Sequence, residues 1–191
     1  MRRRRHRTRQ AGYLMIEVLV ALFILLIGLL GLVSLQSRAQ QAETESYQRI
    51  QALILLRDLA DRINANRASA TSYVTGTGAP LGKGSSKDCS APATTTDNDL
   101  CAWHAALLGA VESSGGDCDA TTGANCVGAM IDARGCVTNL AANQYLLEVV
   151  WQGLVPTVAP PLSVACGSDL YGDETLRRAV TTVVQIGSLT P

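Results

Sequence analysis

The sequence predicts an α+β protein in which one long N-terminal helix packs on a small antiparallel sheet. Residues 18–37 contain no charged side chain, and residues 36–68 contain neither proline nor glycine. A helix can therefore run from an apolar segment into a polar one without a breaker. In two later stretches, 145–151 and 179–186, residues typical of strands recur at every second position and would share one face of a β-strand.

The N-terminal residues 1–12 differ in charge from the rest of the chain. They hold six arginines and no carboxylate, and they form a basic leader. The whole chain has 16 basic and 16 acidic residues. The part after Gly12 has ten of the basic residues and all 16 acidic ones, which gives it a net charge of −6. That balance argues against a nucleic-acid partner, because phosphate contacts need a basic surface.

The apolar segment is long enough to cross a membrane. Twenty residues, 18–37, are uncharged, and at about 1.5 Å per residue they span roughly 30 Å, the thickness of a hydrocarbon core. We expect a transmembrane helix over 13–35. The arginines before it predict a cytoplasmic N-terminus and a head on the other side of the membrane.

An amphipathic continuation of this helix is expected over 36–68, so that the whole helix covers about 13–68. Its apolar residues recur at spacings of three and four, which predicts a stripe that packs on the head. The residues of this stripe are Tyr47, Ile50, Ile54, Leu55, Leu59 and Ile63.

The remaining residues, 69–191, are expected to form the globular head. Serine, threonine, glycine and alanine dominate 69–99, which predicts a loop with a short strand near Tyr73. Asp97 is expected to cap a helix over about 98–111, ended by the Ser-Ser-Gly-Gly run at 113–116. A weaker strand is expected near 127–131.

Six cysteines lie in the head and none in the apolar segment. An even number outside the cytoplasm predicts disulfides, although sequence alone allows many pairings. The pairings we expect are Cys89–Cys101, Cys118–Cys126 and Cys136–Cys166.

Other chemistry has weak support. Cys101 and His104 have the C-x-x-H spacing of a zinc site, but no C-x-x-C pair accompanies them. The acidic residues around Cys118 loosely resemble a calcium loop, yet Gly128 occupies the position of the bidentate glutamate. Motifs for a catalytic triad, a P-loop or a zinc protease are absent from the sequence. We therefore expect no metal, no cofactor and no enzymatic activity.

Glu17 is the most informative residue of the apolar segment. A carboxylate at the centre of a membrane helix costs about 2.5–3.5 kcal/mol on insertion scales, and less near its end. Residues 12–17, GYLMIE, resemble the N-terminal signal of type IV pilins and type II secretion pseudopilins, with Tyr13 in place of the usual phenylalanine. The resemblance implies that a prepilin peptidase cuts after Gly12 and methylates Tyr13. It also implies that Glu17 pairs with the terminal amine of a neighbouring subunit during assembly.

Within this superfamily, the chain looks most similar to the PilV-like minor pilins, and the expected fold is that of a type IV pilin. The similar pieces are residues 46–49, 61–67, 133–136, 150–153 and 166–167, together with Asp99, Leu100, Trp103, Arg177 and Arg178.

The resemblance implies a minor pilin that primes or modifies pilus assembly. It would be anchored in the inner membrane with a periplasmic head and then carried in the pilus to the cell surface. Its partners would be the prepilin peptidase, other minor and major pilins, the assembly platform and the membrane. Two alternatives remain open: a type II secretion pseudopilin, which shares the N-terminus, and a tip adhesin or DNA-uptake pilin that acts as a binding module.

Overall fold

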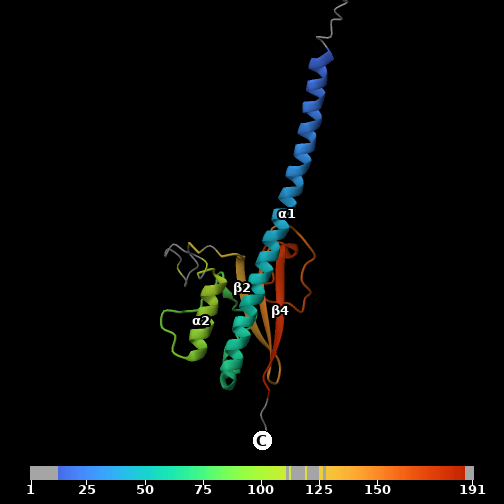
Figure 1. Ribbon diagram of the computed structural model, residues 1–191. Helices are drawn as coiled ribbons and strands as arrows, with labels where there is room; N and C mark the ends of the chain where they lie inside the picture. The colour runs from blue at the N-terminus through green and yellow to red at the C-terminus, as the bar shows by residue number, and fades with distance from the viewer. Residues whose placement is uncertain (1–12, 111, 113–118, 120–124, 127, 188–191) are drawn as a thin grey trace, which may run out of the picture. The chain divides into compact units, whose positions relative to one another are not determined.

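The computed structural model describes residues 13–110, 112, 119, 125–126 and 128–187, with side chains from residue 15 onward. The chain forms two compact units, one up to Glu43 and one from Thr44 onward. The elements are α1 (Tyr13–Ala65), η1 (Arg67–Tyr73), β1 (Leu81–Gly82), α2 (Thr95–Leu107), β2 (Ile131–Ala141), β3 (Gln144–Gln152), η2 (Glu174–Leu176) and β4 (Arg177–Gln185) (Figure 1).

The first unit consists of the N-terminal part of α1. Every large hydrophobic residue from Met15 to Leu35 is more than half exposed. Within the described residues, α1 is also the one helix whose length and composition would allow it to cross a membrane. An apolar surface on all sides is typical of a helix that is covered by lipid or by other helices.

The second unit is built on a four-stranded antiparallel sheet in the order β1-β2-β3-β4. The strands expected at 145–151 and 179–186 are present as β3 and β4. The weak strand expected near 127–131 is wrong in position, since β2 begins only at Ile131 and extends to Ala141. The two-residue strand β1 was not expected, because it is too short to show a period of two.

One face of the sheet is covered by the C-terminal part of α1 and by α2, which lie side by side (Figure 1). The α1 residues in this core are Ala52, Leu56, Leu59 and Ile63, with buried Gln48 next to them. Part of the expected stripe is wrong: Tyr47, Ile50 and Ile54 are 52–55% exposed. The second unit thus buries one apolar face of α1 and leaves another uncovered, and spacing alone did not separate the two.

The end of α1 and the start of α2 differ from expectation. α1 ends at Ala65 instead of about residue 68, and Tyr73 lies in the 3₁₀ turn η1 instead of a strand. Asn66 explains the early end, because its backbone leaves the helical region (φ −108°, ψ 42°). Its side-chain amide instead donates 3.2 Å hydrogen bonds to the Tyr73 hydroxyl and to Thr96 Oγ1.

α2 begins at Thr95 and is capped by Thr94, whose Oγ1 accepts a 3.0 Å hydrogen bond from the Asp97 N–H. Asp97 therefore lies in the first turn and is not the cap, as we had expected. The helix ends at Leu107, before the expected residue 111, and Gly109 follows it with φ +82°. A left-handed glycine just beyond a helix is a common stop. The Ser-Ser-Gly-Gly run at 113–116 lies outside the described residues.

Candidate assembly site

The N-terminal site is carried by the first turns of α1. The helix begins at Tyr13, and Glu17 lies four residues further on with an exposed side chain. Residues 18–37 follow without a charge, and the next carboxylate along the chain is Glu43. Gly12 and the side chain of Tyr13 lie outside the described residues. Cleavage after Gly12, methylation of Tyr13 and pairing of Glu17 thus stay predictions.

The other end of α1 is fixed to the head by a polar network. The Arg62 guanidinium donates to Asp58 at 2.9 Å and to Asp99 of α2 at 3.0 Å. The Tyr73 hydroxyl donates to the second oxygen of Asp99. Burial, followed by the hydrogen bond to Asp99, raises the pKa of Tyr73. The network ties α1, η1 and α2 together, and it explains structurally two of the residues that resemble pilins, Arg62 and Asp99.

Trp103 joins α2 to both α1 and the sheet. Its fully buried indole donates a 3.0 Å hydrogen bond from Nε1 to the carbonyl of Leu55. The ring also lies against the backbone of Gly135 on β2, where an added Cβ would come within 2.2 Å of its Cη2 atom. A side chain at position 135 would therefore displace the ring. These two residues form a single packing contact between α2 and β2.

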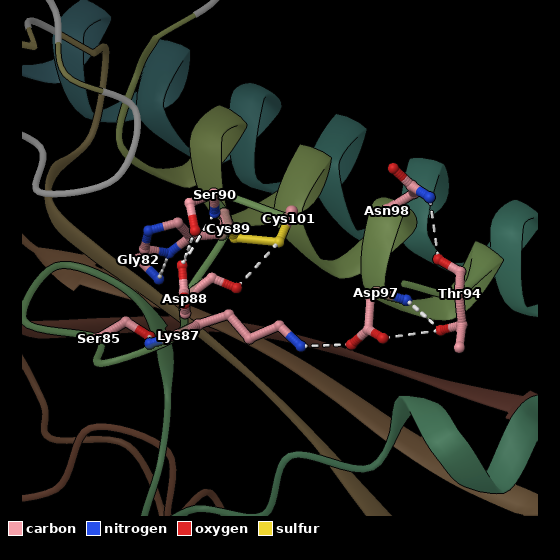
Figure 2. Close-up of a disulfide and its surroundings, with 11 residues drawn as sticks. Gly82, Ser85, Lys87, Asp88, Cys89, Ser90, Thr94, Asp97, Asn98 and Cys101 are labelled. Atoms are coloured by element: carbon pink, nitrogen blue, oxygen red, sulfur yellow. Dashed lines mark hydrogen bonds and ion pairs between the residues drawn. A yellow bond between two sulfur atoms is a disulfide. The ribbon is translucent and has the colours of Figure 1, made fainter. Parts of the chain in front are cut away.

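The Cys89–Cys101 disulfide attaches the loop before α2 to α2 itself (Figure 2). Lys87 of the same loop forms a 2.7 Å ion pair with Asp97. The hydrogen bond that Lys87 donates in this pair is the main cause of the lowered pKa of Asp97. Figure 2 shows both attachments on one side of α2. Closing a loop with a sequence separation of 12 stabilises the fold by about 3 kcal/mol in the chain-entropy description.

The Cys136–Cys166 disulfide joins β2 to the connection between β3 and β4, with a sequence separation of 30. Glu148, the register partner of Cys136, is 1% exposed beneath this connection. Its Oε1 atom has no hydrogen-bond partner, and burial raises the pKa of the carboxyl. Buried Arg177 donates from Nη1 to the carbonyls of residues 164 and 166, at 2.8 and 3.2 Å. The connection is thus held by a covalent bond and by a buried arginine.

A comparison with protein-family models links part of the chain to a known family. Residues 34–106 match the Tt1218-like type IV pilin family. The matched segment holds the larger part of α1, η1, β1 and most of α2, and so includes Arg62, Asp99 and Trp103. No curated protein and no solved structure matches the chain significantly. The match supports a type IV pilin, which is a structural and not an enzymatic class, and the apolar N-terminal helix fits a membrane-anchored pilin.

Two of the three expected cysteine pairings are present in the pilin-like head. Cys126 is also disulfide-bonded, but Cys118, its expected partner, lies outside the described residues. The C-x-x-H pair is used in another way: Cys101 belongs to a disulfide, and Nδ1 of buried His104 accepts a 3.0 Å hydrogen bond from the Gly82 N–H. Among the described residues, no group of three or more histidine, cysteine or acidic side chains could hold a metal ion.

The sequence did not reveal the ion pair between Glu45 and Arg178. Arg178 Nη2 donates to Glu45 at 3.0 Å, across 133 residues of sequence. No local sequence pattern around either residue predicts that the two side chains form a pair. The only signal was that the adjacent arginines 177 and 178 belong to the pieces that resemble minor pilins, and no role was assigned to them.

Proposed function

We propose that this chain is a PilV-like minor pilin of a type IV pilus. A prepilin peptidase cuts it after Gly12 and methylates Tyr13, and the assembly platform moves it from the inner membrane into the fibre, where it primes or modifies assembly. The observation that carries the proposal is the position of Glu17. This carboxylate is exposed on α1, four residues after the proposed new N-terminus, and twenty uncharged residues follow it.

A charge in this position needs a partner of opposite sign. A lone carboxylate in an apolar environment is strongly disfavoured, and pairing with a cation offsets much of that cost. The amine created by cleavage after Gly12 has the right charge and lies about one helical turn, roughly 6 Å, before Glu17 on the same helix. A neighbouring subunit can therefore supply its Tyr13 amine to this Glu17, which fixes the axial position of one subunit relative to the next.

The second apolar face of α1 supports packing against other pilins. Tyr47, Ile50, Leu53 and Ile54 are 46–55% exposed on a helix whose opposite face is buried in the head. Burying apolar side chains of this kind against another helix is favourable in free energy. They belong to the same helix as the exposed hydrophobic residues from Met15 to Leu35, so one element offers apolar surface along most of its length.

The experiment that tests processing is the intact mass of the protein purified from membranes, with and without the peptidase. We expect a chain that begins at Tyr13 and carries one added methyl group, and only when the peptidase is present. A chain that keeps its arginine leader under both conditions would overturn the proposal.

Assembly is tested separately by Glu17→Gln, which keeps the size of the side chain and removes its charge. We expect normal cleavage and at least a tenfold loss of the subunit from sheared fibres, the equivalent of about 1.4 kcal/mol. Glu43→Gln is the matched control, since Glu43 is also exposed on α1 but has no proposed partner. Equal incorporation of the two variants would contradict the pairing.

A further inference from the structure

The connection between β3 and β4 contains a long uncharged segment. Residues 153–164, GLVPTVAPPLSV, hold no charged side chain and three prolines. Two of its side chains are almost fully exposed, Val158 at 91% and Leu162 at 99%. Single exposed aliphatic residues are ordinary, but here they stand at the apex of an apolar loop of twelve residues. We call residues 153–164 the apolar loop; it is part of the orange trace beside β4 in Figure 1.

The base of the apolar loop is attached to α1. The Leu154 N–H donates to Glu45 Oε1 at 3.2 Å, and Arg178 binds the same carboxylate at 3.0 Å. Arg178 also donates to the carbonyl of Val155 at 2.6 Å. Two groups therefore bind the Glu45 carboxylate, and Arg178 also holds the next residue of the loop. Glu45 itself lies one position after Thr44, the first residue of the second unit.

The apex of the apolar loop is held at the same end of the sheet. On one side the Thr157 N–H donates to the carbonyl of Thr175 at 2.8 Å, just before β4. On the other side Arg177, the first residue of β4, donates to the carbonyl of Val164 at 2.8 Å. Residues 158–162 thus project from the corner where β3 ends and β4 begins. The β2–β3 turn lies at the opposite end of the strands.

Chain connectivity sets an upper limit on the distance between the uncharged run and Glu45, which binds the base of the apolar loop. The uncharged run ends at Ser37, and Glu45 is eight residues further on. Even a fully extended chain of eight residues spans at most about 28 Å. While the segment 18–37 crosses a bilayer, Glu45 therefore lies within about 28 Å of the end of that segment, so the apolar loop can reach the membrane surface.

The composition of the loop fits the polar–apolar boundary of a membrane. The three prolines lack an N–H group, so fewer backbone donors lose their hydrogen bonds to water when the loop enters an apolar environment. Valine and leucine side chains gain from contact with acyl chains, and the loop has no charge to be desolvated.

We propose that residues 158–162 insert into the outer headgroup region of the membrane in which the subunit is anchored, with Val158 and Leu162 as the contacting side chains. This contact rests on the membrane anchoring in the proposed function. It holds the corner of the head against the bilayer before extraction, and it must be released when the subunit enters a fibre.

Tryptophan substitutions in the full-length protein test the contact. The protein is reconstituted in phosphatidylcholine–phosphatidylglycerol vesicles with and without brominated acyl chains, which quench indole emission. The native Trp103 and Trp151 are buried in the head and provide a background that the parent protein measures. Leu162→Trp should show at least twofold quenching of its added emission, and Val158→Trp should repeat the result.

Two controls separate the possible failures. Leu140→Trp lies on β2 near its turn, at the other end of the strands; the parent side chain is half exposed (53%), and the variant should stay unquenched. Leu25→Trp lies in the apolar segment and should be strongly quenched. If Leu25→Trp is quenched but Leu162→Trp matches Leu140→Trp, the loop contact is wrong and anchoring stands. If Leu25→Trp is unquenched, anchoring fails and the loop contact with it. A blue shift of Leu162→Trp that grows with protein density without lipid quenching would assign the loop to a second subunit and overturn the proposal.

Discussion

The contact between Gly135 and Trp103 gives the sharpest test of how the head is packed. A methyl group added at position 135 would lie 2.2 Å from Cη2 and 2.7 Å from Cζ3 of the indole, and 2.9 Å from a methyl carbon of Leu107. The indole is fully buried, and its Nε1 bond to the Leu55 carbonyl resists a shift. Gly135→Ala therefore forces either a strained contact or the loss of that hydrogen bond.

The cost follows from these two terms. Overpacking by one carbon in a closed core costs about 1–3 kcal/mol, and losing a buried hydrogen bond adds about 1 kcal/mol. We expect the free energy of unfolding to fall by about 2–4 kcal/mol. For a unit of this size the fall corresponds to a decrease in Tm of roughly 4–16 °C.

The assay is thermal and urea unfolding of the full-length protein in detergent micelles, followed by far-UV circular dichroism. Gly78→Ala is the control, because its added Cβ meets nothing within 4 Å and its φ is not positive; it should change stability by less than about 0.5 kcal/mol. Trp103→Phe shortens the ring, so the double variant with Gly135→Ala should lose at least about 1 kcal/mol less than the sum of the single variants. Additive effects in this cycle would refute the packing argument.

The remaining predictions concern polar groups of the head. Asp99→Ala removes the acceptor of buried Tyr73 and should lower the free energy of unfolding by about 2–3 kcal/mol. Asp58→Ala breaks only the more exposed pair with Arg62 and should lower it by less than about 1 kcal/mol in the same unfolding assay. Equal losses for the two variants would contradict the network. Burial raises the pKa of Glu148, so the folded state keeps a proton that the unfolded state has released, and stability falls as pH rises above its ordinary pKa of about 4.3. The Tm of Glu148→Gln minus that of the parent should therefore increase as the pH is raised above about 4.3, and a difference independent of pH would exclude this role.

Strong local periodicity explains which elements could be predicted. Tyr145, Leu147, Val149 and Trp151 occupy every second position of β3, and Val180, Thr182 and Val184 do so in β4. The uncharged run before Ser37 leaves few options besides a helix. In contrast, β2 has Arg134, Gly135 and Cys136 at its centre, and large apolar residues do not recur at every second position of this strand. The central part of β2 is covered on one face by α2 and on the other by the disulfide-bonded connection to Cys166. The centre of β3 is also buried on both faces, but there the large residues of one face still mark every second position, whereas the small and charged residues of β2 mark none.

The residues of the N-terminal site could be predicted from the sequence, whereas the contacts within the head could not. Gly12, Tyr13 and Glu17 lie within six residues, where spacing itself carries the information. The Glu45–Arg178 pair and the Tyr73–Asp99 hydrogen bond join residues 133 and 26 positions apart. Such pairs become neighbours only after α1, α2 and β4 are placed. Local patterns therefore could not assign them, although Asp99 and Arg178 were already among the pieces that resemble minor pilins.

The distribution of burial along α1 implies that assembly and stability can be changed separately. Among the described residues, the first buried side chain is Gln48, whose Oε1 accepts a 3.1 Å hydrogen bond from Trp151. Everything that closes the core of the head thus lies after the boundary at Thr44. A substitution at Glu17 removes no contact of that core, and one at Gly135 leaves the N-terminal signal intact. Loss of fibre incorporation by Glu17→Gln at an unchanged Tm would therefore report on contacts between subunits, since the fold of the subunit itself is not perturbed.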